Sequence, residues 1–163
     1  MEANFRNLAG LDGKRIIVVE DDAVLALDIS DQLRDIGATV LGPAPTAYYA
    51  LQLIGPERRR LDGAVLDIQL HGKTVYEFAD VLTERQVPFL FATALDRKSI
   101  PPRFEHAPIL KKPVPPEALA AAVKEMVLRP PVARVTLPVP PEIAQEVPVV
   151  VFARVVARTL NGA

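Results

Sequence analysis

Four short apolar segments of this chain each end in polar side chains that could take part in metal or phosphoryl chemistry. The polar residues at these ends are Glu20, Asp21, Asp67, Thr93 and Lys112. Clustered carboxylates repel one another, so such a cluster tolerates burial only when a cation neutralises it. Ligands that are all oxygen atoms select a hard ion such as Mg²⁺, which is usually shared with phosphate oxygens. A lysine and a hydroxyl across the pocket would complete a phosphoryl site.

Asp67 lies in the apolar segment 63–70, at the carboxyl end of a predicted strand. Such a run is typical of a parallel strand that is covered on both faces. A carboxylate at its end costs free energy unless a metal or a ligand compensates the charge. Taken alone, the position of Asp67 favours an aspartate that ends a strand and caps the next turn. The polar residues at the other strand ends favour the reactive interpretation.

Strands and helices are predicted to alternate along residues 14–129. Strands are expected at residues 15–19, 39–41, 63–70, 89–92 and 108–111. Helices are expected between Asp22 and Gly37, at residues 46–54, from Thr74 to the residue before Pro88, and at residues 117–128. This alternation indicates an α/β fold in which a doubly wound parallel sheet has helices on both faces. In such sheets the ligand site lies at the carboxyl ends of the strands.

The first predicted helix has Asp22 as its N-cap and Gly37 as its left-handed cap. Its apolar stripe consists of Leu25, Ile29, Leu33 and Ile36. The strand that follows is short, and Gly42-Pro43 is predicted as a turn after it.

The third predicted helix opens with a capping box, Thr74-Val75-Tyr76-Glu77. Its inward face is expected to consist of Val75, Phe78, Ala79 and Leu82. Prolines at Pro101-Pro102 restrict residues 96–106 to short helical turns at most. The last helix is expected to bury Leu119, Val123 and Met126.

The composition excludes several classes of function. The chain has 163 residues, half of them hydrophobic, which suffices for one ordinary core. A formal net charge of -1 argues against nucleic acid as a partner, because no basic face is available to neutralise phosphates. The chain has no cysteine, and residues 1–14 resemble neither a signal peptide nor a membrane anchor. We therefore expect a cytoplasmic protein that binds neither DNA nor membrane.

Residues 14–129 resemble the receiver domains of two-component response regulators. The resemblance rests on the polar residues at the strand ends, together with Ala94 after Thr93 and Pro113 after Lys112. It implies a five-stranded, flavodoxin-like sheet with strand order 2-1-3-4-5. It also implies a signalling domain that is not an enzyme on external substrates and catalyses only its own aspartyl phosphorylation and dephosphorylation.

The same resemblance assigns roles to individual residues. Asp67 would be the phosphoacceptor. The Mg²⁺ cofactor would be bound by Glu20, Asp21, Asp67 and the backbone carbonyl of Gln69. The phosphoryl oxygens would be held by Thr93, the backbone of Ala94, and Lys112. The implied partners are a sensor histidine kinase or a histidine phosphotransfer protein as donor, and a downstream protein as the receiver of the signal.

The segment Phe91-Ala92-Thr93-Ala94-Leu95 is similar to the FATGUY subgroup of stand-alone receivers. Two positions depart from that pattern, because Ala94 replaces a glycine and Asp96 stands where the subgroup has an aromatic residue. Ile109 stands where many receivers have an aromatic switch residue. We therefore expect switching to rest on Thr93 and Lys112 and not on a rotating ring.

For two further residues near the predicted site, the position in the sequence predicts an orientation or a role. Lys111 is expected to point away from the acids, since successive strand residues face opposite sides. His71 follows Asp67 closely and could tune access to it, although a solvated loop histidine is the simpler interpretation.

The segments outside residues 14–129 do not match the receiver pattern. Residues 1–13 are an N-terminal extension, and residues 130–163 form a proline- and valine-rich tail without an output motif. An apolar tail of this length is predicted to be a contact surface. It would pack either on its own receiver or on a second chain, which would give a homodimer through the tail.

Three other functions compete with the phosphoacceptor interpretation. A degenerate receiver would be a phosphorylation-independent interaction module, but the intact acids and Lys112 argue against it. A phosphohydrolase of the haloacid dehalogenase type needs a second acid two residues after the nucleophile, where Gln69 stands. A flavodoxin-like cofactor binder needs a glycine-rich or hydroxyl-rich phosphate loop, which the predicted loops lack.

Overall fold

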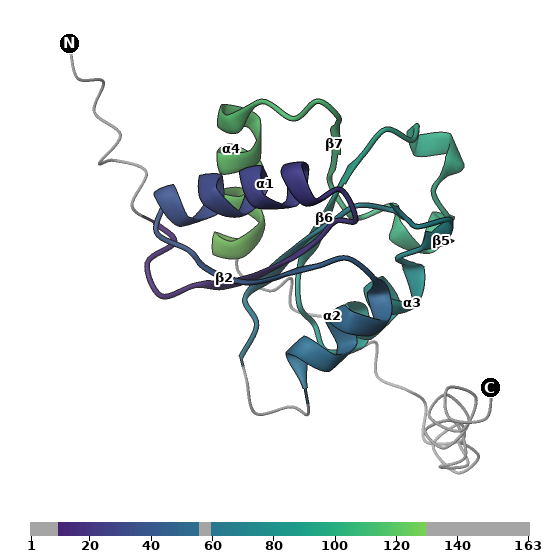
Figure 1. Cartoon of the computed structure of the whole chain (residues 1–163), viewed down its shortest axis with the longest axis horizontal. Helices are drawn as coiled ribbons and strands as arrows, with labels where there is room; N and C mark the ends of the chain where they lie inside the picture. Colours follow the sequence, from purple (N-terminus) through teal and green to yellow (C-terminus); the bar gives the residue numbers. More distant parts are fainter. Residues whose placement is uncertain (1–9, 56–59, 130–163) are drawn as a thin grey trace, which may run out of the picture. The chain divides into compact units, whose positions relative to one another are not determined.

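The computed structural model describes residues 10–55 and 60–129, which contain a parallel five-stranded sheet (Figure 1). Its strands are β1 Arg15–Val19, β2 Thr39–Ala44, β3 Gly63–Leu66, β6 Phe89–Thr93 and β7 Ile109–Lys111. The strand order is β2-β1-β3-β6-β7, with each neighbouring pair parallel. Since β6 and β7 are the fourth and fifth strands of this sheet, the predicted order 2-1-3-4-5 is confirmed.

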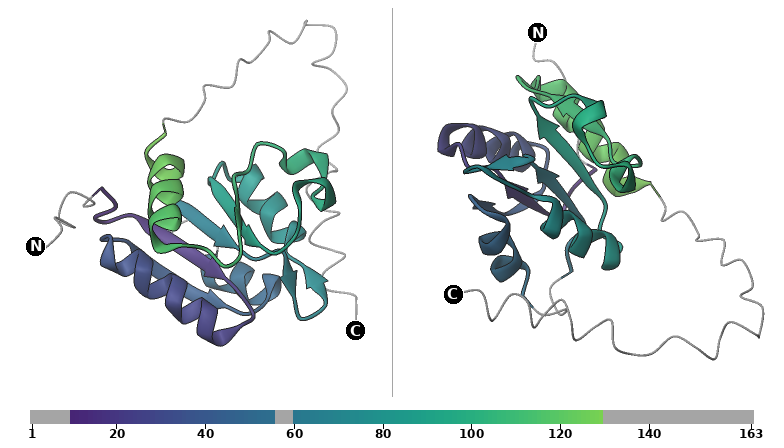
Figure 2. Two further views of the ribbon diagram at one scale, coloured as in Figure 1. Left: turned by 90° about the horizontal axis from the view of Figure 1, so that it is seen from above. Right: turned by 90° about the vertical axis from the view of Figure 1, so that its right-hand side faces the viewer.

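Helices cover both faces of the sheet (Figure 2). One face carries α1 Ala23–Asp35 and α4 Pro116–Leu128, and the other carries α2 Ala47–Ile54 and α3 Tyr76–Glu84. Each strand residue therefore meets one of two apolar layers. Val65 packs in the layer under α1 and α4, and its neighbours Ala64 and Leu66 pack in the layer under α2 and α3. This confirms the doubly wound α/β fold.

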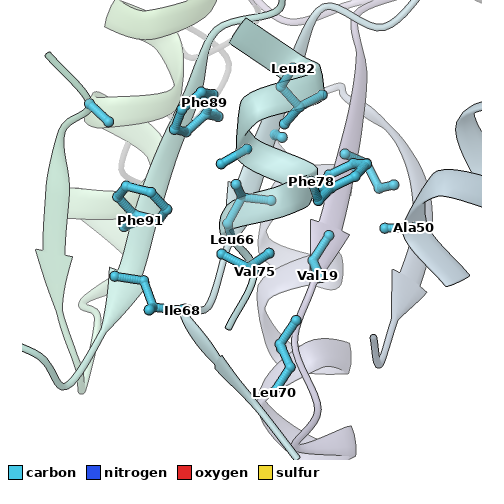
Figure 3. Close-up of a cluster of buried hydrophobic side chains, with 14 of the residues drawn as sticks. Val19, Ala50, Leu66, Ile68, Leu70, Val75, Phe78, Leu82, Phe89 and Phe91 are labelled. Carbon is cyan, nitrogen blue, oxygen red and sulfur yellow. The ribbon is translucent and has the colours of Figure 1, made fainter. Parts of the chain in front are cut away.

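The layer under α2 and α3 is built mainly of aromatic and branched side chains (Figure 3). Phe78 and Leu82 of α3 are fully buried in the same cluster as Leu66 of β3. The buried residues of α3 include the predicted Phe78, Ala79 and Leu82, and Val75 is buried just before the helix begins. Packing on both faces fixes the position of β3 and of the residue that follows it.

Helix α1 begins as predicted, because the Asp22 carboxylate accepts hydrogen bonds from the backbone nitrogens of Val24 and Leu25 at 2.9 and 3.0 Å. Its buried residues are Ala26, Ile29, Ser30 and Leu33. The prediction that Leu25 belongs to the core face is wrong, since Leu25 is 37% exposed. Successive helical residues turn by about 100°, which places Leu25 at the edge of the stripe that Ile29 and Leu33 share.

Strand β2 is longer than predicted and extends through Gly42-Pro43 to Ala44. The predicted turn at Gly42-Pro43 is therefore wrong. The Gly42-Pro43 bond is cis, and the register against β1 shifts between Ile17 and Val19. Proline lacks a backbone N–H, so it is tolerated here because β2 is an edge strand of the sheet.

The segment after Asp67 forms a small antiparallel hairpin of β4 Gln69–Leu70 and β5 Lys73–Thr74. The predicted capping box is wrong, because Thr74 pairs with Gln69 in this hairpin and caps no helix. Val75 follows the hairpin and donates its backbone N–H to the carbonyl of Ile68 at 2.9 Å. Helix α3 therefore begins at Tyr76 without a side-chain cap.

The connection from β6 to β7 contains two 3-10 turns, η2 Arg97–Ser99 and η3 Pro102–Phe104, in agreement with the prediction of short helical turns. The Arg97 guanidinium donates to the carbonyls of Phe104, Glu105 and Ala107 at 3.4, 3.3 and 2.8 Å. Phe104 is buried and stacks on Tyr76, with ring centroids 5.4 Å apart. These contacts tie the two turns to each other and to α3.

Several predictions concern residues 1–9, 56–59 and 130–163, which lie outside the described residues. They include most of the N-terminal extension 1–13 and all of the predicted contact surface at residues 130–163. Within residues 10–55 and 60–129, every helix is too short or too polar to cross a membrane.

Candidate functional site

Three acids from two adjacent strands meet at the carboxyl edge of the sheet. Glu20 and Asp21 follow β1, Asp67 follows β3, and one carboxylate oxygen of each lies within 4.8 Å of the others. The register of the strands explains this, because Val19 pairs with Leu66, the last residue of β3. The backbone N–H of Asp67 also donates to the carbonyl of Val19 at 2.8 Å. The structure therefore brings together the three acids predicted from the sequence.

Lys112 also belongs to this acidic cluster, although it follows β7, the edge strand two positions from β3 in the sheet. Its ammonium lies 2.6 Å from Glu20 Oε2 and 3.0 Å from Asp67 Oδ2. The backbone of Lys112 is held by the end of β6, since its N–H donates to the carbonyl of Thr93 at 3.1 Å. Glu20 and Asp67 are buried, and the Lys112 side chain is 19% exposed. The ion pairs are therefore screened less by solvent than surface pairs.

Backbone amides orient three further carboxylate oxygens. Asp67 Oδ1 accepts from the N–H of Ile68 at 2.7 Å, and Glu20 Oε1 accepts from the N–H of Asp22 at 3.0 Å. Asp21 Oδ2 accepts from the N–H of His71 at 2.8 Å. Each acid therefore has one oxygen that is fixed by its own or a neighbouring loop.

The pKa values of the cluster reflect burial and these hydrogen bonds. Burial raises the pKa of Glu20, although the hydrogen bonds from Lys112 and Asp22 oppose this rise. The backbone hydrogen bond from His71 lowers the pKa of Asp21. For Lys112, burial alone would lower the pKa, but the hydrogen bonds to Glu20 and Asp67 outweigh it and the pKa is raised. Lys112 therefore stays an ammonium at neutral pH.

The donor set suits a divalent cation. Three carboxylates and one ammonium leave an excess of two negative charges when all four groups are ionised. The donors are all oxygen atoms, which is the chemistry that Mg²⁺ prefers. Glu20, Asp21 and Asp67 could thus bind a metal ion of this class.

The other residues predicted for the site, in the part of the chain that the structure describes, form no hydrogen bond with the three acids. Thr93 is the buried last residue of β6, Ala94 follows it, and Gln69 begins β4 two residues after Asp67. Among the hydrogen bonds within residues 10–55 and 60–129, none joins these three residues to Glu20, Asp21 or Asp67, and within the cluster Thr93 is linked only to Lys112, through its backbone carbonyl. Thr93 Oγ1 instead accepts from the backbone N–H of Leu95 at 3.2 Å.

His71 is closer to the site than the solvated loop residue expected from the sequence. The hairpin turns at His71 and Gly72, which both have positive φ. This turn directs the N–H of His71 at Asp21 and places its Nδ1 3.6 Å from Asp21 Oδ2, while the imidazole stays 63% exposed. The sequence signal was the His71-Gly72 pair directly after Leu70, which is typical of a tight turn.

Lys111 makes contacts that the sequence did not predict. Its ammonium donates to the carbonyl of Ala94 at 2.8 Å and forms an ion pair with Asp96 Oδ1 at 2.6 Å. It contacts none of the three acids, in agreement with strand alternation. Two consecutive lysines therefore serve two separate groups of residues.

No family model matches the chain. The solution structure of SdrG from Sphingomonas melonis Fr1 is 31% identical, with a TM-score of 0.61, and the match covers 71% of this chain and 97% of SdrG. The beryllofluoride-activated DrrB receiver domain is 27% identical, with a TM-score of 0.59, and the match covers 71% of this chain and 98% of DrrB. The chain contains a response regulator receiver domain.

A longer regulator also matches this receiver domain. The phyllosphere-induced regulator PhyR of Methylorubrum extorquens is 29% identical over 124 residues, which are 74% of this chain and 46% of PhyR. The chain thus spans about half the length of the curated relatives it matches. In this receiver the acids, the lysine after the last sheet strand and the hydroxyl residue that ends β6 all occupy the carboxyl edge of the sheet.

Proposed function

We propose that this receiver is a phosphoacceptor of a two-component or phosphorelay system, and that Asp67 accepts the phosphoryl group. The observation that carries the proposal is the convergence of Glu20, Asp21 and Asp67, with the Lys112 ammonium bridging Glu20 and Asp67. This arrangement combines a nucleophilic carboxylate, a set of cation ligands and a positive charge within one cluster. Those are the parts that phosphoryl transfer requires, because positioning and charge neutralisation provide most of its catalysis.

The residues that would hold Mg²⁺ are Glu20, Asp21, Asp67 and the backbone carbonyl of Gln69. When bound, Mg²⁺ supplies charge neutralisation for a phosphoryl group that approaches an anionic site. Glu20 would act mainly through a metal-bound water, while Asp21 would be a direct ligand. The amide of His71 already orients the Asp21 carboxylate and lowers its pKa, which keeps this ligand ionised.

The transfer itself would form a bond between a carboxylate oxygen of Asp67 and phosphorus as the N–P bond of a phosphohistidine breaks. The electron pair of that bond stays on the imidazole nitrogen of the donor. Asp67 Oδ2 is the oxygen that faces Lys112, whereas Oδ1 is held by the amide of Ile68. We therefore assign the new bond to Oδ2.

Three groups would bind the transferred phosphoryl oxygens. Lys112 would exchange its contact with Asp67 for one with a phosphoryl oxygen, because both partners are anionic and occupy the same region. The Thr93 hydroxyl and the backbone N–H of Ala94 would supply the remaining hydrogen bonds. Movement of Thr93 and Lys112 toward the phosphoryl group would carry the signal to the β6–β7 connection.

The donor in this proposal is a sensor histidine kinase or a histidine phosphotransfer protein, and the output is a contact with a downstream protein. Receivers are typically cytoplasmic, and we propose the same location for this one. The segment Phe91-Ala92-Thr93-Ala94-Leu95 supports assignment to the FATGUY subgroup. Residues 130–163 would be a contact surface for the receiver itself or for a second chain.

Intact-mass measurement after incubation with acetyl phosphate or phosphoramidate tests this function. The wild-type chain is expected to gain the mass of one phosphoryl group with Mg²⁺ present and none after chelation. Asp67→Asn should abolish the gain, because an amide oxygen is a poor nucleophile. Asp80→Asn is the matched control, since Asp80 is a half-buried acid that pairs with Arg103 and belongs to no cluster with Asp67. Equal phosphorylation of the Asp67→Asn and wild-type chains would show that Asp67 is not the acceptor.

A further inference from the structure

Lys111 holds the loop that follows the proposed phosphoryl-binding threonine. Lys111 is the last residue of β7 and pairs in register with Thr93, the last residue of β6. From this position its ammonium reaches over the loop of residues 94–96. It donates to the Ala94 carbonyl at 2.8 Å and contacts Asp96 Oδ1 at 2.6 Å.

The peptide group between Ala94 and Leu95 is fixed at both of its polar atoms. Its carbonyl oxygen accepts from the Lys111 ammonium, and its N–H donates to Thr93 Oγ1 at 3.2 Å. A charged donor on the carbonyl polarises the peptide, which strengthens the N–H as a donor on the other side. Lys111 is therefore connected to the Thr93 hydroxyl through a single peptide group.

This connection leaves the hydroxyl proton of Thr93 free to be donated to a phosphoryl oxygen. The hydroxyl oxygen of Thr93 already accepts the N–H of Leu95, so its O–H is directed away from that bond. Thr93 is 1% exposed, so bulk water has little access to the hydroxyl. An O–H that is oriented in advance loses less entropy when it binds a phosphoryl oxygen.

We propose that Lys111, oriented by Asp96, is a positioning residue for phosphoryl transfer: it fixes the Ala94–Leu95 peptide, which in turn orients the Thr93 hydroxyl toward the transferred group. The inference rests on the proposed function of Asp67 as phosphoacceptor. Lys111 touches neither the acids nor the reacting atoms, so it acts entirely through Thr93.

The other contacts of the β6–β7 connection explain why Lys111 is the residue that holds the loop of residues 94–96. The remainder of the β6–β7 connection is held by Arg97, whose guanidinium bonds three carbonyls of the η3 region. Residues 94–96 lie between that anchor and the end of β6. Lys111 is the side chain that ties the carbonyl and the carboxylate of this short segment to the sheet.

The ion pair contributes little to the stability of the fold. The side chains of Lys111 and Asp96 are 54% and 78% exposed, and pairs exposed to this degree are screened by solvent. A variant that lacks the Lys111 ammonium should therefore fold normally. Any change in its phosphorylation then reports on geometry and not on unfolding.

The first test compares the phosphorylation rates of variants with phosphoramidate at saturating Mg²⁺. Lys111→Met should slow the phosphorylation of Asp67 by about 2- to 10-fold, the range that corresponds to loss of one hydrogen bond in the transition state. Lys111→Arg should recover most of the rate, because a guanidinium can donate to the same carbonyl. Lys98→Met is the matched control: Lys98 is exposed in the neighbouring η2 turn and has the same charge.

The second test places Lys111→Met in a Thr93→Ala background. Thr93→Ala is expected to slow phosphorylation by itself, and Lys111→Met should then cause no further loss, since the group it positions is absent. Equal slowing by Lys111→Met in both backgrounds would overturn the proposal, because Lys111 would act independently of Thr93.

A third readout does not need phosphorylation. In the unphosphorylated, metal-free protein, Lys111→Met should accelerate hydrogen exchange at the Leu95 amide, and Lys98→Met should not. Unchanged exchange in Lys111→Met would show that the lysine does not hold this peptide. A wild-type chain that accepts no phosphoryl group would overturn the proposed function and this inference together. A wild-type chain that is phosphorylated at the same rate as Lys111→Met would overturn this inference alone.

Discussion

The ammonium groups of Lys111 and Lys112 serve different networks although the two residues are neighbours in the chain. Lys112 lies 2.6 Å from Glu20 and 3.0 Å from Asp67, whereas Lys111 contacts the Ala94 carbonyl and Asp96. The division follows from their backbone positions: Lys111 is the last residue of β7, and Lys112 follows the strand. One lysine therefore neutralises the acids, and the other holds the loop beside them.

Lys112→Met should destabilise the metal-free receiver, because it leaves Glu20 and Asp67 close together without a compensating charge. We expect a loss of about 3–5 kcal/mol in the free energy of unfolding, the usual cost of removing one partner from a buried ion pair. Adding Mg²⁺ should restore part of this loss, since a cation replaces the missing ammonium. Urea unfolding with and without Mg²⁺ measures both effects, with Lys124→Met as the control. An equal response of Lys112→Met and Lys124→Met to Mg²⁺ would contradict this account.

Asp21→Asn should weaken Mg²⁺ binding by at least about tenfold, because losing even an outer-shell partner of a metal typically costs 10- to 100-fold. The asparagine oxygen can still accept the amide of His71, so the hairpin should stay in place. The metal-free variant should be as stable as the wild type or slightly more stable, because one repulsive charge is removed. Isothermal titration with Mg²⁺ measures the affinity, and Asp28→Asn on the exposed face of α1 is the control. Unchanged affinity in Asp21→Asn would remove Asp21 from the set of ligands.

The Lys111–Asp96 pair should give the 94–96 loop a distinct pH dependence. The hydrogen bond from Lys111 lowers the pKa of Asp96, so the pair is intact above the ordinary aspartate pKa of about 3.9 and is lost as pH falls through the lower folded value. The Asp96 carboxyl shift in NMR should therefore titrate below the ordinary range in the wild type. In Lys111→Met it should return to that range. An Asp96 pKa that is the same in both proteins would show that the pair does not form in solution.

Deleting residues 130–163 should change either the oligomeric state or the stability of the chain. The segment contains nine valines but only three arginines and two glutamates, so it offers a large apolar surface to bury. If it packs on its own receiver, deletion lowers the unfolding temperature; if it joins two chains, deletion converts a dimer into a monomer. Light scattering and thermal unfolding of the two chains separate these outcomes. A truncated chain that is unchanged in both, and in affinity for its kinase partner, would show that the tail is an appendage.

The sequence determined most of the fold by itself, because its strands are encoded locally. The run that became β1 is β-branched from Ile16 to Val19, and the run that became β6 is apolar from Phe89 to Ala92. Their lengths and spacing indicate a parallel sheet with helices on both faces. Once that sheet is predicted, the site follows, since the carboxyl ends of parallel strands share one edge. The convergence of Glu20, Asp21 and Asp67 was predictable for this reason.

Tertiary structure decided the features that depend on which strand is at an edge and which segments pair. Gly42-Pro43 carries a turn signal, but on the edge of the sheet the same residues continue β2. Thr74 carries a capping signal, but pairing with Gln69 places it in a hairpin instead. In both cases a local preference was overridden by hydrogen bonds to a partner that the local sequence does not specify.

The contacts of His71 and Lys111 show most clearly that tertiary structure sets the partners of polar side chains. His71 meets Asp21 across 50 residues of chain, and Lys111 meets Ala94 across 17. Each contact depends on the direction of a turn or a side chain after the strands have paired, and a small change in register would abolish it. Sequence patterns specify which face of an element is buried, but the partners of exposed polar groups are set only when the packed elements fix their distances.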